Sequence, residues 1–80
     1  MASQSRDVSR EQAQTALSRL LLARIRQDRY PSYTQMTMVE QVLPRSLYRD
    51  YLNILFEKLI DDPRPSTTMV RRIQRIIAML

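Results

Sequence analysis

Four prolines divide this chain into segments, and the chain contains no glycine that could break a helix in another way. Proline fixes φ, lacks a backbone donor, and keeps the residue before it out of the α conformation. Pro31 therefore ends a first helix, and Pro44 ends or opens another. Pro63 and Pro65 end a third. Between these breaks, apolar residues recur at the spacing of one helix face, so the sequence predicts an all-α fold.

The start and stop signals predict four helices, at about residues 10–28, 33–43, 45–61 and 67–79. Ser9 is the expected N-cap of the first helix, and Gln12 completes a capping box with it. Ser32 and Gln35 repeat this pattern before the second helix, and Ser66 is the expected N-cap of the fourth.

The polar start of the chain is expected to be a flexible segment over residues 1–8, followed by a single domain over residues 9–80. The segment MASQSRDVSR has no apolar stretch typical of a signal peptide. No apolar run approaches the length that spans a membrane. The expected location is therefore cytoplasmic.

Apolar residues at helical spacing are expected to face a shared core. The first helix contributes Ala13, Ala16, Leu17, Leu20, Leu21 and Ile25, and the second Met36, Val39, Val42 and Leu43. The third contributes Leu47, Tyr51, Ile54, Leu55 and Leu59, widened by Tyr48, Leu52, Phe56 and Ile60. It is therefore expected to be central and covered on more than one side. The fourth contributes Met69, Val70, Ile73, Ile76, Ile77 and Leu80.

The two halves of the chain resemble each other, over about residues 16–46 and 50–80. Their loops align Asp28 with Asp62, Pro31 with Pro65, Ser32 with Ser66 and Thr34 with Thr68. We expect four helices as two sequence-related αα-hairpins that form a small bundle. A fragment of a helical solenoid is the alternative. The repeated aspartates are expected to serve the starts of the helices that follow them, where a carboxylate is favourable.

Histidine, cysteine and glycine are all absent, which removes most of the usual chemistry of active sites. These absences exclude the commonest general base, thiol nucleophiles, thiolate metal sites and glycine-rich phosphate loops. Asp61 and Asp62 are adjacent in a proline-rich loop, where burial is not expected. We therefore expect no enzyme, no catalytic residue, no metal, no cofactor and no small-molecule substrate.

The chain carries 13 basic and 8 acidic residues, which gives a formal charge of +5. On the fourth helix, Arg71, Arg72 and Arg75 are expected to face outward. The first helix and its exit add Arg19, Arg24, Arg26 and Arg29. If both sets lie on one side, they form a surface that attracts phosphates. The alternative is a solvated face in which acidic residues pair with some arginines, the candidates being Glu11, Asp50 and Glu57.

Several large apolar residues lie off the most regular stripes and are candidates for an exposed interface: Tyr33, Met38, Tyr48, Phe56 and Met79. Interface centres are enriched in Tyr, Met and Arg. The alternative is that the four helices bury all of these residues. A homodimer through the third or fourth helix would satisfy both interpretations.

The leading expectation is a small protein–protein interaction module that acts as an adaptor, regulator or assembly subunit. The alternative function is a basic DNA- or RNA-binding protein that contacts phosphates through Arg71, Arg72 and Arg75. Binding of the fourth helix to a membrane surface is less favoured, because its isoleucines match expected core positions of the first half.

Overall fold

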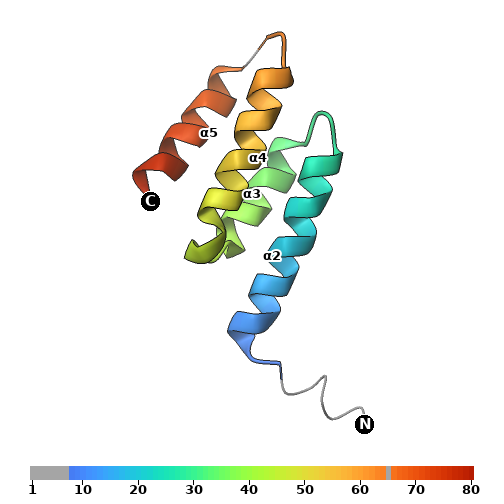
Figure 1. Ribbon diagram of the computed structural model, residues 1–80, viewed down its shortest axis with the longest axis vertical. Coiled ribbons are helices and arrows are strands. Elements are labelled where there is room, and N and C mark those ends of the chain that lie inside the picture. The colour runs from blue at the N-terminus through green and yellow to red at the C-terminus, as the bar shows by residue number, and fades with distance from the viewer. Residues whose placement is uncertain (1–7, 65) are drawn as a thin grey trace.

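The computed structural model describes residues 8–64 and 66–80, which form an all-α bundle (Figure 1). Its helices are α2 (Arg10–Gln27), α3 (Tyr33–Val42), α4 (Tyr48–Asp61) and α5 (Thr67–Ala78), with the short 3-10 helix η1 (Arg45–Leu47) before α4. These bounds confirm the four helices that the sequence predicts. The expected flexible segment lies almost wholly in residues 1–7, outside the described residues. None of the helices described is both long and apolar enough to cross a membrane.

Serine caps set three of the helix starts, as the sequence predicts. The Ser9 hydroxyl accepts the Gln12 amide at 3.0 Å, and the Gln12 side chain accepts the Ser9 amide at 3.0 Å, so the capping box is complete. The Ser32 hydroxyl accepts the Gln35 amide at 3.1 Å, but among the described residues the Gln35 side chain returns no bond, so the second predicted capping box is only half formed. The Ser66 hydroxyl accepts the Met69 amide at 3.0 Å. Each cap satisfies a backbone donor that the first turn of a helix leaves free.

The repeated aspartates end helices rather than start them. Asp28 is the C-cap of α2, and Asp62 is the C-cap of α4. The Asp62 carboxylate accepts the amide of Arg64 at 2.9 Å, which is a turn within the loop. At Asp62, this bond to Arg64 takes the place of the expected contact between the carboxylate and the start of α5. Pro65, the repeated proline of this loop, lies outside the described residues.

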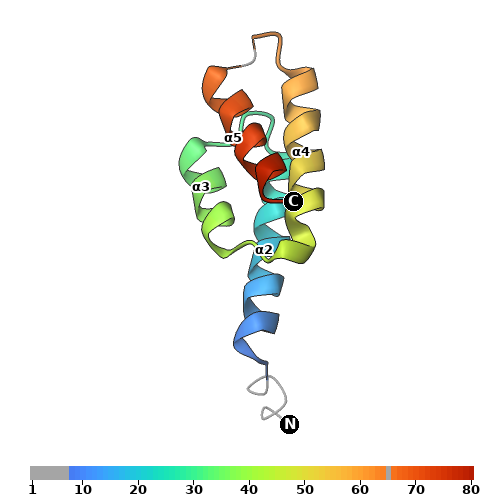
Figure 2. The same ribbon diagram turned by 90° about the vertical axis from the view of Figure 1, so that its left-hand side faces the viewer.

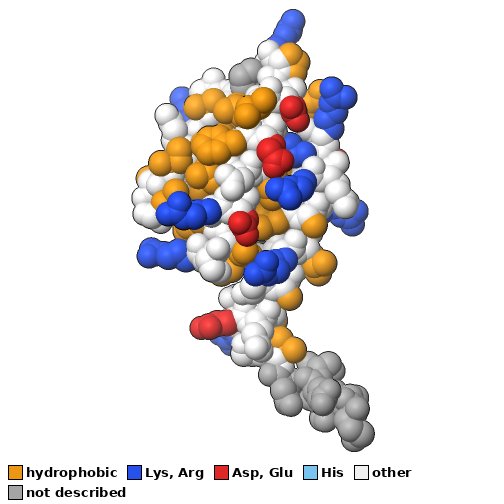
Figure 3. All heavy atoms as spheres, in the orientation of Figure 1, with side chains coloured by type: hydrophobic (Ala, Val, Ile, Leu, Met, Phe, Trp, Pro, Cys, Tyr) orange, Lys and Arg blue, Asp and Glu red, His pale blue; other side chains and the backbone are white. Residues whose placement is uncertain are grey.

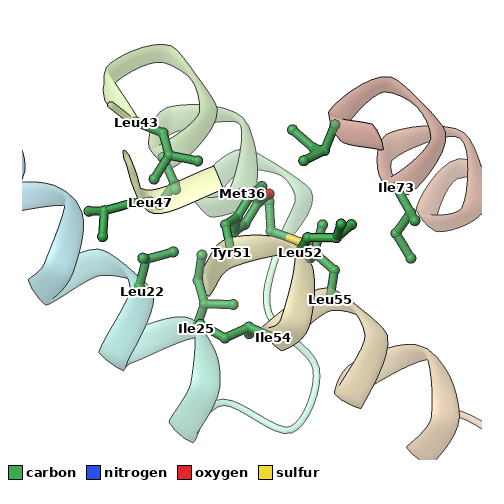
Figure 4. Packing of buried hydrophobic residues seen from close by; sticks show 12 residues of the cluster. Leu22, Ile25, Met36, Leu43, Leu47, Tyr51, Leu52, Ile54, Leu55 and Ile73 are labelled. Carbon is green, nitrogen blue, oxygen red and sulfur yellow. The ribbon is translucent and has the colours of Figure 1, made fainter. Parts of the chain in front are cut away.

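The closest backbone approaches join α2 to α3, α2 to α4 and α4 to α5. Figure 2 shows α5 in front, between α3 on the left and α4 on the right, with α2 behind them. The core lies between these helices, and Tyr51, Ile25, Met36, Leu55 and Val39 are its largest fully buried side chains. In Figure 4, Leu52 and Leu55 of α4 lie beside Ile73 of α5, and Ile54 lies beside Ile25 of α2. The helix α4 therefore packs on α2 along one side and on α5 along another.

The buried face of α2 differs from the predicted stripe. Ser18, Leu22 and Ile25 are buried, whereas Leu17 is 46% exposed and Leu20 is 71% exposed. The first turns of α2 extend beyond the other helices (Figures 1 and 2), which leaves Ala13 and Ala16 exposed, whereas Leu20 is exposed because helical spacing puts it on the side of α2 opposite the buried Leu22. Ser18 faces inward because its hydroxyl donates to the Val42 carbonyl at 3.3 Å, which lets α2 pack closely on α3.

Fewer apolar residues of α4 and α5 are buried than the sequence predicts. Ile73 and Ile76 are buried, but Val70, Ile77 and Leu80 are exposed. Phe56 and Ile60 of α4 are exposed as well. The cause is that α5 packs on one flank of α4 and leaves the outward flank of both helices uncovered by the described elements.

The caps generate a stability prediction. We expect Ser32→Ala to lower the free energy of unfolding by about 0.5–2 kcal/mol, because it frees the donor at the start of α3. Ser66→Ala should cost at least as much, since its hydroxyl also bonds the Tyr33 phenol. Urea denaturation measures both changes. Ser46→Ala, at an exposed position of η1, is the control, and equal stability of all three variants would contradict the caps.

Candidate functional site

A buried ion pair joins α5 to α3. The Arg72 side chain is 5% exposed, and its Nη1 donates to Glu40 Oε2 at 2.5 Å. Its Nη2 lies 3.5 Å from Thr37 Oγ1. Thr37 and Glu40 are both on α3, so one guanidinium contacts two side chains of the facing helix.

The predicted outward orientation of Arg72 is therefore wrong. The prediction grouped Arg72 with its exposed neighbours Arg71 and Arg75. Helical spacing also places Arg72 next to Met69 and Ile76, at i−3 and i+4, and Ile76 is buried while Met69 packs against the core. Arg72 consequently lies at the inner edge of α5, where it is not available to bind phosphates.

Glu40 also accepts a hydrogen bond from the buried phenol of Tyr51 on α4. Burial raises the pKa of Tyr51 above its ordinary value, and the bond to Glu40 and its negative charge raise it further. Burial alone would lower the pKa of Arg72, but the bond and charge of Glu40 outweigh it, so the net shift is upward. The Glu40 carboxylate thus accepts hydrogen bonds from both α4 and α5.

Two further contacts complete the polar connection between α3 and α5. The Arg72 guanidinium lies over the Tyr33 ring, 5.7 Å from its centroid, and the Tyr33 phenol is 2.6 Å from the Ser66 hydroxyl. Within the described part of the chain, Arg72 Nε is buried without a hydrogen-bond partner. The group of Tyr33, Thr37, Glu40, Tyr51 and Arg72, named here the polar cluster, acts as a cross-link inside the fold.

Glu40 was not predicted as a site residue, although the sequence contains a signal for it. Glu40 follows Met36 by four residues and precedes Leu43 by three, and both of these apolar residues are buried. An acidic residue at helical spacing inside an apolar stripe indicates a paired carboxylate, because an unpaired buried charge is costly. Arg72 likewise lies at helical spacing from the apolar residues Met69 and Ile76 of α5, so the pair could have been proposed from the two stripes together.

The other predicted arginines are exposed but are not brought onto one surface. Arg71 and Arg75 lie on α5, with Arg75 Nη2 4.0 Å from Glu40 Oε1. The remaining candidates, on α2 and its exit, are Arg19, Arg24, Arg26 and Arg29. Figure 1 places α2 and α5 at opposite edges of the bundle, with α4 between them. The expected continuous basic surface is therefore divided in two.

Some of the basic residues near α2 are engaged in local contacts. Arg26 Nη2 is 3.2 Å from Glu57 Oε1, so Glu57, one of the acidic residues predicted to pair with an arginine, does so. The Arg29 guanidinium lies 5.6 Å from the Tyr30 ring centroid. Lys58 Nζ donates to the Arg26 carbonyl at 2.6 Å, where a cation is favourable because α2 ends there.

Of the five apolar interface candidates, four are exposed: Tyr33, Met38, Phe56 and Met79. Tyr48 is half-buried and packs against the core, so it is not an exposed candidate. The sequence analysis missed Ile60, which is 81% exposed, as well as Val70 and Ile77, because it assigned all three to the core.

An apolar surface runs along the seam between α4 and α5. Phe56 and Ile60 continue the row of Leu52 along α4 at spacings of four, and Val70 and Ile77 flank Ile73 on the side of α5 away from Arg72. Figure 3 shows hydrophobic side chains gathered over these two helices, with acidic and basic side chains side by side next to them. We name the surface of Phe56, Ile60, Val70 and Ile77 the outer face.

A hollow of about 190 Å³ lies where the two interhelical loops approach each other. Its lining includes the cations Arg29 and Lys58 and the carboxylates Asp61 and Asp62. Because both signs of charge are present, the hollow has no strong preference for either an anion or a cation.

No family model matches the chain, and no match to it was found among curated proteins or solved structures.

The buried ion pair predicts a large difference between two adjacent arginines. We expect Arg72→Leu to lower the free energy of unfolding by about 3 kcal/mol or more, because it leaves Glu40 without its buried partner. Arg71→Leu, the matched control at an exposed position, should change stability by less than about 0.5 kcal/mol. Chemical denaturation measures both. Equal losses in the two variants would show that Arg72 is not held in a buried pair.

A second prediction concerns alkaline pH. The folded pKa of Tyr51 is raised above its unfolded value near 10.0, so its contribution to stability is complete below pH 10 and is lost as the pH rises further. Subtracting the tyrosinate absorbance of Tyr51→Phe from that of the wild type isolates this phenol. We expect it to ionise together with the loss of helical circular dichroism. Ionisation near pH 10 with the helices intact would contradict its burial.

Proposed function

We propose that this protein is a non-enzymatic helical interaction module, acting as an adaptor, regulator or assembly subunit that binds protein through exposed apolar helical surfaces. The observation that carries the proposal is the outer face, where apolar side chains of two helices adjoin without a covering element among the residues described. Single exposed apolar residues are normal on small proteins, but adjoining ones mark interaction sites.

The buried ionisable groups support a non-enzymatic role. Tyr51 and Arg72 both donate hydrogen bonds to Glu40 inside the bundle, so these ionisable groups stabilise the fold. General acid–base catalysis requires a group within reach of a substrate proton and able to exchange it near neutral pH. The raised pKa values of Tyr51 and Arg72 do not favour that exchange.

Nucleic-acid binding is the second candidate, favoured by the formal charge of +5. Of the three arginines first assigned to phosphates, Arg71 and Arg75 remain exposed, whereas Arg72 is bonded to Glu40. Two phosphate contacts on duplex DNA would give a log–log salt dependence of about −1.8. The separation of the α2 arginines from α5 makes this function less favoured than protein binding.

The two halves of the chain and its location in the cell are also part of the proposal. We infer that α2–α3 and α4–α5 are sequence-related αα-hairpins, supported by the equivalent caps Ser32 and Ser66 and by the burial of the equivalent residues Val39 and Ile73. The halves differ at the equivalent residues Leu20 and Ile54, because Leu20 is exposed and Ile54 is buried. We also propose a cytoplasmic location.

The proposed function predicts binding that survives nuclease and salt. Immobilised protein should capture a protein partner equally from nuclease-treated lysate at low and high salt, because apolar contacts depend little on ionic strength. Ile60→Glu on the outer face should abolish this capture. Leu20→Glu is the control, because Leu20 lies on α2 and is exposed to a similar extent as Ile60, and this variant should still capture the partner. Capture of nucleic acid alone would overturn protein binding in favour of the second candidate.

A further inference from the structure

The outer face combines apolar character with charged edges of opposite sign. Arg71 lies at its edge on α5, on the side directed away from α4. Glu57 lies at its edge on α4, on the side directed away from α5, next to Arg26 of α2. Both residues are exposed. One edge therefore presents a cation, and the other presents a carboxylate that is paired from its far side with Arg26 of the same chain.

These two charges lie at the same height along the hairpin. The helices α4 and α5 are antiparallel neighbours (Figure 1), with α4 ending at Asp61 and α5 beginning at Thr67. Glu57 is four residues before the end of α4, and Arg71 is four residues after the start of α5. A surface of this kind is complementary to itself under one particular rotation.

We propose that a second copy of this chain covers the outer face, forming a two-fold dimer whose axis runs parallel to α4 and α5. This inference rests on the proposed function and names the partner. Rotation about such an axis keeps each residue at its height and exchanges the two edges. Arg71 of each copy then faces Glu57 of the other, and the apolar residues of the two faces pack together.

The charges select this axis over the other face-to-face arrangement. A two-fold axis lying across the helices would set α5 against α5 and α4 against α4. The edge with Arg71 would then meet its own equivalent, and so would the edge with Glu57. Like charges brought together oppose association, so only the axis along the helices makes the edges complementary.

The size of the face sets the strength of the dimer. The 14 residues of α4 extend over about 21 Å, and two adjacent helices are about 20 Å wide, so the face covers about 400 Å² in projection. The two faces together bury about 800 Å², which is below the roughly 1,000 Å² of stable specific interfaces and corresponds to a weak, transient complex. The dimer is therefore a reversible one, whose fraction rises with protein concentration.

Sedimentation velocity of the full chain over a concentration series tests the dimer. We expect the average mass to rise from monomer towards dimer. Ile60→Glu and Ile77→Glu should each weaken association more than about 30-fold, because each places two unpaired carboxylates in the interface. Leu20→Glu, on the exposed side of α2, should dimerise like the wild type. Helical circular dichroism checks that each variant is folded.

A charge exchange tests the axis. Arg71→Glu and Glu57→Arg should each weaken self-association about 10-fold, because each homodimer then holds two like-charged pairs. An equimolar mixture of the two variants restores both opposite-charge pairs, so it should associate as strongly as the wild type. A role of either residue within one chain cannot produce this recovery on mixing.

A monomer at all concentrations up to about 1 mM, or a dimer that Ile60→Glu leaves intact, would overturn the proposal. Failure of the mixture to recover would overturn the assigned axis. These results are separable from the proposed function. A chain that stays monomeric, yet captures a foreign protein in an Ile60-dependent way, retains the module and loses the dimer.

Discussion

The burial of one charge, the Arg72 guanidinium, determines how α5 lies on the rest of the fold. A buried guanidinium is costly unless it is paired and hydrogen-bonded. Only one rotation of α5 directs Arg72 to Glu40 of α3 while Ile73 and Ile76 enter the core. No close backbone approach joins α3 to α5 among the described residues, so their connection is made by side chains. The polar cluster therefore fixes an orientation that apolar contacts alone would leave open to sliding or rotation.

That orientation explains the surface of the molecule. With Arg72 directed to α3, the opposite flank of α5 carries Val70 and Ile77 outward, and Phe56 and Ile60 are exposed on the adjoining helix α4. The same buried pair removes a cation from the outside of α5 and leaves Arg71 as a single charge at the edge of the outer face. An internal polar contact thus leaves an external apolar surface with Arg71 at one edge and the Glu57 carboxylate, paired with Arg26, at the other, which is why a self-complementary arrangement is our preferred proposal.

The two functional candidates depend on different parts of this surface. Protein binding uses the outer face, which α4 and α5 form together, and needs no residue that the fold has already engaged. Phosphate binding would use arginines that the fold separates, because α2 and α5 lie at opposite edges of the bundle (Figure 1). The net charge favours acidic partners in general, but the geometry gives the apolar surface the more continuous area.

Local signals in the sequence determined the helices, because serine caps and prolines act within one turn of the chain and need no tertiary partner. Ser9, Ser32 and Ser66 were predicted as N-caps and are N-caps. The buried face of each helix was less predictable, since a broad apolar pattern fits several rotations. Leu20 and Ile77 were assigned to the core and are exposed, whereas Ser18 and Arg72 were not and are buried. Only the tertiary structure decided these cases, because a polar residue enters a core only where a partner, Val42 for Ser18 and Glu40 for Arg72, lies at the matching height of another helix.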